Sequence, residues 1–294
     1  MKLVVTLPLL AAAMSATAQA PDAKPARVVA MMAAVGDRIE LVTQHPETGS
    51  HLEPYAREVL QVPSQALNYA VLRGLNAAMA DEQPQTERVL LQWTLPAKLA
   101  DRIQNALGPE RQSLVLDAVM HYLSALPERQ NWDQVELVVP TYKLSPLSGM
   151  GMRLSGIGIF VQTVTSHNYN GRFDSYGRVP TSYNTDGYYK TVDPNTGKIA
   201  NSSVYVAPYM YFERLTYNAK TLELIKRQDF YASTKYADPQ TITYDVAQQL
   251  PVAQLTDKLM EMIEHAAYQS IHPTASEVKV SPIKVLPANS AAGG

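Results

Sequence analysis

The chain of 294 residues contains no cysteine. It can therefore form no disulfide and carries no thiol nucleophile, which excludes disulfide-stapled scaffolds and cysteine hydrolases. A bacterial lipoprotein carries its lipid on a cysteine, so no lipid anchor is expected either. The fold must depend on a core of ordinary size, and an apolar content of 46% can supply one.

Long apolar runs are also scarce. One lies in the first twenty residues, "MKLVVTLPLLAAAMSATAQA", where a single basic residue precedes an apolar stretch that small residues close. This pattern is typical of a secretory signal peptide over residues 1–20, with cleavage before Gln19 or Pro21. No later stretch approaches about twenty apolar residues, so no transmembrane segment is expected after cleavage. The predicted location is the bacterial periplasm or the secreted fraction.

Excess charge of one sign is missing. The chain has 25 Lys and Arg against 27 Asp and Glu, and its formal net charge is −2. Proteins that bind nucleic acid use a surplus of basic side chains to displace counterions from phosphates. We therefore expect no nucleic-acid partner.

The motifs of familiar hydrolases are absent as well. There is no G-x-S-x-G and no H-E-x-x-H, which removes the usual serine elbow and the commonest zinc peptidase pattern. S-x-x-K occurs at 276–279 and 281–284, inside a C-terminal stretch over 273–294 that is poor in core residues. We expect this stretch to be a flexible tail, which cannot hold a nucleophile and its base in register. No cofactor is expected.

The first half of the mature chain alternates strand-like and helix-like patterns. Apolar runs at 26–35 and 38–44 flank Gly36-Asp37, which predicts a hairpin. Ser64 is the predicted N-cap of a helix in which apolar residues recur every four positions. The same reasoning predicts further elements in this order: a strand over 87–95, helices over 96–107 and 110–126, and a strand over 134–142.

The second half has three strand-like runs with no helix between them, at 156–164, 202–217 and 221–234. They predict an antiparallel extension with a turn at 217–221, in which Asn218 is able to take a positive φ. A last amphipathic helix is predicted over 252–269. Together these elements predict one α/β (or α+β) domain over 21–272. Its mixed sheet should have a parallel N-terminal part, an antiparallel C-terminal extension and packing helices.

One segment, at about 166–203, differs in composition and is dense in Tyr, Asn, Gly and Ser. With so few aliphatic residues it cannot build a core, so it is either a surface insertion, with a small hairpin turning at 193–197, or a recognition loop. Tyrosine gives broad contact at low entropic cost, which favours a binding role for its ring-bearing positions. The candidates are Tyr169, Tyr176, Tyr183, Tyr188 and Tyr189.

A second polar segment places His45, Glu47 and His51 within seven residues. Three local ligands and turn-forming neighbours predict a polar loop without a bound metal, and these residues are weak candidates for catalysis. If the strand at 38–44 runs parallel to those at 87–95 and 134–142, the loop lies with Trp93 and Tyr142 at the carboxyl ends of one sheet. Open α/β sheets bind ligands at that edge, so Trp93 and Tyr142 are further binding candidates.

These observations predict an exported bacterial envelope protein with a non-catalytic binding or assembly role. Its expected partner is an envelope protein or a glycan. The alternative is a periplasmic hydrolase of an envelope sugar or phosphoester that uses the loop at 45–51.

Overall fold

The computed structural model describes residues 27–44, 55–63, 65–143, 154–162, 189–202, 204–238, 250 and 252–272. The predicted signal peptide and C-terminal tail lie outside these ranges and stay predictions. The strands are β1 Val28–Ala33, β2 Arg38–Gln44, β3 Tyr55–Gln61, β4 Glu87–Leu91, β5 Gln134–Pro140, β6 Ile157–Gln162, β7 Tyr189–Val192, β8 Ile199–Ser202, β9 Tyr205–Asn218 and β10 Leu224–Ser233. The helices are α1 Ala66–Glu82, α2 Ala97–Asn105, α3 Gly108–Ser124, the short 3-10 helix η1 Pro127–Asn131, and α5 Val252–Ile271.

The predicted fold class is confirmed, because the main sheet is mixed and helices pack on it. β1 runs parallel to β4 and β5, and β2 runs parallel to β6. β9 runs antiparallel to β5, β6 and β10, which is the predicted antiparallel extension. β3 closes a hairpin with β2 at the outer side of the sheet.

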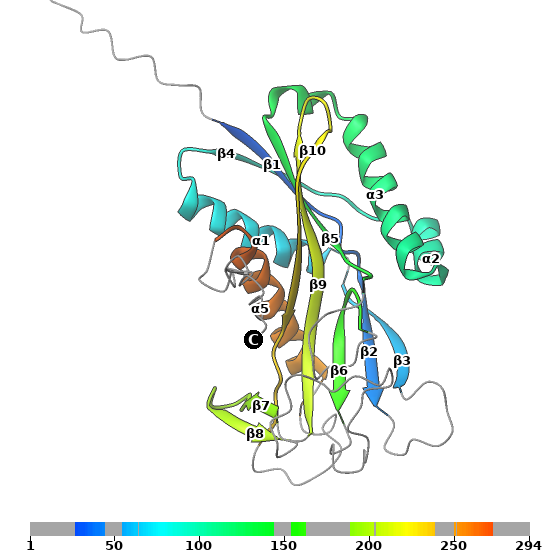
Figure 1. Ribbon diagram of the computed structural model, residues 1–294, viewed down its shortest axis with the longest axis vertical. Helices are drawn as coiled ribbons and strands as arrows, with labels where there is room; N and C mark the ends of the chain where they lie inside the picture. The colour runs from blue at the N-terminus through cyan, green and yellow to red at the C-terminus, as the bar shows by residue number, and fades with distance from the viewer. Residues whose placement is uncertain are drawn as a thin grey trace, which may run out of the picture.

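The sheet is built in two tiers along β9, the long strand at the centre of Figure 1. Residues 205–210 of β9 pair with β6, and residues 212–218 pair with β5. β5 and β6 therefore lie end to end on the same side of β9, and their outer neighbours β1 and β2 also follow one another. We call β4, β1 and β5 the upper tier, and β3, β2 and β6 the lower tier.

The predicted hairpin between 26–35 and 38–44 is wrong. β1 and β2 point in the same direction and pair with different strands, so the chain at Gly36-Asp37 shifts sideways without reversing. Gly36 has φ 83°, a value that glycine adopts without strain. A short Gly/Asp break between two apolar runs indicates a change of path, and the tertiary partners decide whether that path reverses.

The strand that forms a hairpin with β2 is β3, which the sequence pattern did not reveal. β3 has mostly exposed side chains, including Arg57 and Glu58. Charged side chains are common on strands at the edge of a sheet, where one side faces water. The loop with His45, Glu47 and His51 falls between β2 and β3, outside the described residues.

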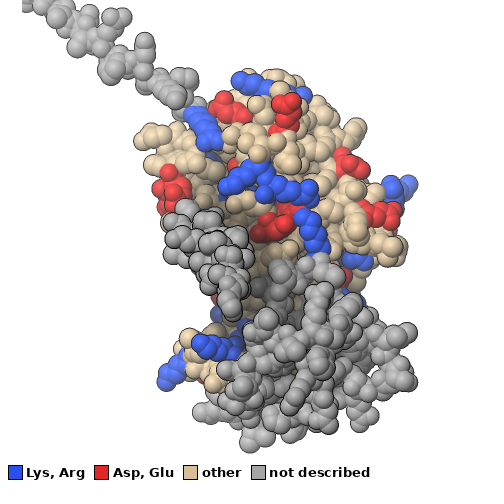
Figure 2. All heavy atoms as spheres, in the orientation of Figure 1, with Lys and Arg blue, Asp and Glu red and all other residues tan. Residues whose placement is uncertain are grey.

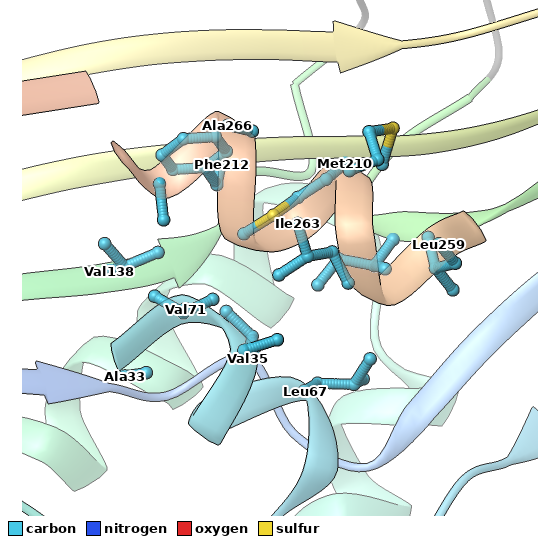
Figure 3. Close-up of a cluster of buried hydrophobic side chains, with 14 of the residues drawn as sticks. Ala33, Val35, Leu67, Val71, Val138, Met210, Phe212, Leu259, Ile263 and Ala266 are labelled. Carbon is cyan, nitrogen blue, oxygen red and sulfur yellow. The ribbon is translucent and has the colours of Figure 1, made fainter. Parts of the chain in front are cut away.

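Helices cover both faces of the upper tier. On one face, α1 and α5 pack against each other and against β1, β5, β6 and β9, and Figure 3 shows Leu67 and Val71 of α1 near Leu259 and Ile263 of α5. The predicted apolar face of α5 is confirmed, since its Leu255, Leu259, Met262, Ile263 and Ala266 are all buried. On the other face, α2 and α3 cover a second core centred on Met32, Val119 and Leu137.

Several local details differ from expectation. The residue that precedes α1 as its N-cap is Gln65, with φ 69°, whereas the predicted cap Ser64 lies outside the described residues. The turn at 217–221 forms as predicted, but Leu222 takes the positive φ of 60°. Asn218 instead accepts backbone hydrogen bonds from Lys220 and Thr221 through its side-chain oxygen. Asparagine thus stabilises the turn by hydrogen bonding, as such residues often do.

The predicted small hairpin inside the segment 166–203 is confirmed at its C-terminal end. β7 and β8 pair antiparallel, and the connection begins at Asp193, whose side chain accepts hydrogen bonds from the backbone of Asn195 and Thr196. Gly197 has φ 70° in the same turn. In the part of the chain that the structure describes, no helix combines the length and the apolar content needed to cross a membrane.

Candidate functional site

A pocket of about 70 Å³ opens where the upper tier meets the lower tier. It lies at the carboxyl ends of β1 and β5, beneath α2 and α3, which agrees with the usual position of ligand sites in open α/β sheets. We call it the step pocket. Apolar residues form about half of its wall, and the polar residues that line it are Asp37, Arg38, Glu40, Gln104, Arg111, Tyr142 and Ser155.

The backbone at the joint between β5 and β6 fixes one wall of the pocket. The N–H of Gly156 donates to the Thr141 carbonyl at 2.8 Å, and both residues bond to the backbone of Tyr211 on β9. Thr141 and Gly156 thus lie at the same point of the sheet. Gly156 has φ 69°, and an added Cβ there would lie 3.3 Å from the Tyr142 ring. Glycine therefore permits both the backbone turn and the close approach of the ring.

Tyr142 is the predicted binding residue that the structure brings to this pocket. The Arg111 guanidinium carbon lies 5.4 Å from the centre of its ring, within the range of a cation–π contact. Burial raises the pKa of Tyr142 to about 12, because the phenolate would lose its hydration. Tyr142 is therefore a neutral hydroxyl at physiological pH.

Glu40 joins two arginines at the rim. Its carboxylate accepts from Arg57 of β3 at 3.1 Å and from Arg111 of α3 at 3.3 Å. Arg111 also donates to the carbonyls of Gln104 and Ala106 and thereby caps the C-terminal end of α2. A further pair, Arg38 with Asp101 on α2 at 2.9 Å, lies beside it. These ion pairs tie both strands of the β2–β3 hairpin to the helices above the pocket.

Below Glu40, the lower tier carries a row of aromatic side chains on the same face. Tyr209 is fully buried, and its hydroxyl lies over Gly158, where an added Cβ would be 2.7 Å from the oxygen. Burial raises the pKa of Tyr209 well above its usual value, and the nearby charge of Glu40 adds to the effect. Gly158 is thus needed for the close packing of this ring on the sheet.

Lys143, which follows Tyr142, belongs to a separate charged cluster. Its ammonium lies 2.7 Å from the fully buried carboxylate of Glu213 and also pairs with Asp229. Arg227 and Gln112 reach the other oxygen of Glu213. Because both Glu213 and Asp229 favour its charged form, the pKa of Lys143 is raised. Since a buried carboxylate requires such partners, this cluster is explained by the fold alone.

Trp93 was predicted as a binding residue, but the structure does not bring it to the step pocket, and its binding role stays a prediction. Its side chain is buried in the core under α3 together with that of Leu91, the last residue of β4. The period of two along the strand could have shown this, because Leu91 and Trp93 are two residues apart. Its carbonyl instead accepts a hydrogen bond from the Gln65 side chain at the start of α1.

The expected shared edge of loop, Trp93 and Tyr142 is also corrected. β2 is parallel to β4 and β5 as supposed, but it begins where β1 ends. Thr43 of β2 pairs with Val161 of β6, which in turn pairs with Val206 of β9. Pro140 of β5 pairs with Phe212 of β9. At about 3.3 Å per residue, the end of β2 lies roughly 20 Å beyond the end of β5 along the sheet.

The remaining predicted residues divide into two groups. Tyr189 of β7 is described, and its ring packs edge-on against Tyr205 with 5.1 Å between the centres. The others lie outside the described residues, so their predicted roles stay predictions. They are His45, Glu47, His51, Tyr169, Tyr176, Tyr183 and Tyr188.

Sequence reasoning missed Glu40 and Arg111. A carboxylate between Ile39 and Leu41, in the middle of a strand-like run, is a signal that could have pointed to Glu40. Arg111 gives no such signal, because a basic residue near the start of a helix is normally a solvated side chain. Only the approach of α3 to β2 brings the two together.

Within the described ranges, no three His, Asp or Glu side chains are grouped so that they could hold a metal ion. On the face seen in Figure 2, basic and acidic side chains lie close to one another. The chain matched no model of a known protein family and no curated protein sequence.

Proposed function

We propose that this protein is an exported envelope protein with a non-catalytic binding or assembly role, and that the step pocket receives one apolar group of its partner. The observation that carries the proposal is a small preformed pocket whose wall is about half apolar and whose arginines are held in ion pairs. Export rests on the signal-like pattern of residues 1–20. N-terminal mass analysis tests it, with Gln19 or Pro21 as the expected first residue.

The size of the pocket limits what can enter it. About 70 Å³ gives space for roughly five water molecules, which corresponds to one side chain or one ring substituent. A whole sugar or nucleotide would need a much larger cavity. A pocket of this size therefore suits an anchor group that projects from a larger partner.

The rim charges favour binding over catalysis. Arg38 is paired with Asp101, and Arg57 and Arg111 share the carboxylate of Glu40. Charges that are already satisfied within the protein have little capacity to stabilise new charge in a transition state. They do keep the polar part of the wall rigid and hydrated beside the apolar part, and a polar surround of an apolar contact is the usual arrangement of an interface anchor.

The position of β3 favours a protein as the partner over a glycan. Among the described strands, β3 pairs only with β2, and Val59 of β3 lines the pocket with 42% of its surface exposed. An extended segment of another protein can pair with such an edge through backbone hydrogen bonds. Its alternate side chains would then lie on the face where the pocket opens.

The test compares two substitutions on strands at opposite edges of the sheet. Val59→Lys places a charge at the pocket, and Leu90→Lys places one on β4, where the native side chain is similarly exposed at 49%. We expect the partner that co-purifies with the wild-type protein from native envelopes to be lost with Val59→Lys and kept with Leu90→Lys. Retention by both variants, or loss by both at unchanged urea midpoints, would contradict the proposal.

The rival hydrolase gains no support from the described residues. Its candidate residues, His45, Glu47 and His51, lie outside them. We therefore advance the binding role alone.

A further inference from the structure

Residues 234–237, directly after β10, connect the small β7–β8 hairpin to the main sheet. Val192 of β7 donates its N–H to the Lys235 carbonyl at 2.8 Å, and Ala237 donates to the Val192 carbonyl. On the other side, Tyr236 exchanges both backbone hydrogen bonds with Val206 of β9. The backbone around Lys235 is thus held from two sides, which gives its side chain a defined starting point.

The side chain of Lys235 lies against two tyrosine rings. Its ammonium nitrogen is 4.4 Å from the centre of the Tyr189 ring and 5.2 Å from the centre of the Tyr205 ring. Both distances fall within the range of cation–π attraction. The two rings are themselves in edge contact, so they form a fixed aromatic seat for the cation.

This cation has no counter-ion among the described residues. None of the ion pairs there includes Lys235, although its side chain is only partly exposed. An ammonium group has three N–H donors and accepts no hydrogen bond. Ring faces attract the charge, but they do not replace the oxygen acceptors that a partly buried ammonium normally finds.

The surroundings add positive charge. Lys190 and Lys198 lie on the same β7–β8 hairpin, and Figure 2 shows basic side chains gathered over that part of the molecule. The carboxylate of Asp193 is occupied by hydrogen bonds within its own turn. Burial also lowers the pKa of Lys235, as expected for an ammonium that lacks a compensating anion.

We propose that Lys235, seated on Tyr189 and Tyr205, is a binding site for an anionic oxygen group, either a carboxylate or a phosphate of an envelope ligand. The site lies at the lower end of the sheet, away from the step pocket, and does not depend on the binding role proposed for that pocket. A bound oxygen anion would supply the acceptors that the ammonium lacks.

The first experiment measures the accessibility of Lys235 in the full-length mature protein. An amine-acylating reagent is applied at constant pH and ionic strength in chloride, inorganic phosphate or acetate, and the labelling rate of each lysine is followed by mass spectrometry. We expect phosphate, acetate or both to slow labelling of Lys235 several-fold and saturably. Lys98, an exposed lysine on α2, is the internal control and should be unaffected.

The two anions distinguish the possible sources. Protection by phosphate alone assigns a phosphate ligand, protection by acetate alone assigns a carboxylate, and protection by both assigns a site for either. Equal slowing at Lys98, or no slowing at Lys235 with either anion, would overturn the proposal.

A second measurement uses substitutions of matched length. An anion that binds the folded state raises its Tm. This rise should be lost in Lys235→Met, which keeps the apolar stem on the rings, and should persist in Lys98→Met. The same rise in both variants would show that the anion acts elsewhere and would refute the site.

Discussion

Gly74 lies at the crossing of α1 and α5, which is the most extensive contact between helices among the described residues. A substitution at Gly74 tests this contact. A Cβ added at Gly74 would lie 2.1 Å from the carbonyl oxygen of Glu264 and 2.9 Å from the Cβ of Ala267, both on α5. These neighbours are backbone or attached directly to it, so they cannot rotate away as the end of a long side chain can. Gly74→Ala would therefore force α5 away from α1.

Two opposing effects set the magnitude. In a helix without such a neighbour, glycine to alanine stabilises by about 1 kcal/mol, because alanine loses less backbone entropy on folding. Overpacking of a core costs about 3 kcal/mol at the upper end of its usual range, and the backbone clash places Gly74 there. We expect Gly74→Ala to lower the free energy of unfolding by about 2 kcal/mol or more.

The assay is urea unfolding followed by circular dichroism. The matched control is Ala77→Gly, at an exposed position of the same helix, which measures the local helix propensity alone. It should cost about 1 kcal/mol. If Gly74→Ala raised the urea midpoint by as much as Ala77→Gly lowered it, α5 would not cross α1 at this point and the arrangement of Figure 3 would be wrong.

Two further predictions concern the core and the step pocket. Leu259→Ala removes a fully buried side chain of α5 and should lower the free energy of unfolding by about 2–5 kcal/mol. Glu261→Ala, in an exposed pair with Lys258, should lower it by less than about 0.5 kcal/mol. Equal urea midpoints for the two variants would contradict the packing of α5. Burial raises the pKa of Tyr142 to about 12, so between pH 10 and 12 the unfolded state releases this proton first and stability falls as pH rises. Tyr142→Phe should lessen that alkaline loss, and an unchanged pH profile in denaturant titrations would place Tyr142 in water.

The elements themselves were largely predictable, because their patterns are local. Leu255, Leu259 and Ile263 share one face of a helix at any position in space, and the apolar run of β5 can lie only inside a sheet with both faces covered. The helices α1, α2 and α3 follow from the same periodicity. Such patterns show which face of an element is buried, but the same face can be buried in many different tertiary arrangements.

The site was predicted only in part. Tyr142 was expected at the carboxyl end of a parallel strand, and the pocket does lie there. Glu40, Arg111 and Val59 meet at that pocket from three different elements, none of them adjacent in sequence. The contact of Lys235 with Tyr189 likewise depends on the bridging of two sheets by residues 234–237.

By itself, the sequence determined the dependence on an ordinary core, the mixed α/β class and the apolar faces of α1 and α5. These follow from composition and from periods of two and 3.6 residues, which depend on near neighbours. Tertiary structure alone decided that β1 and β2 follow one another along the sheet, that β3 takes its edge, and that the step between the tiers opens a pocket. Strand pairing depends on many contacts between residues that are distant in sequence, so no single stretch of sequence predicts it.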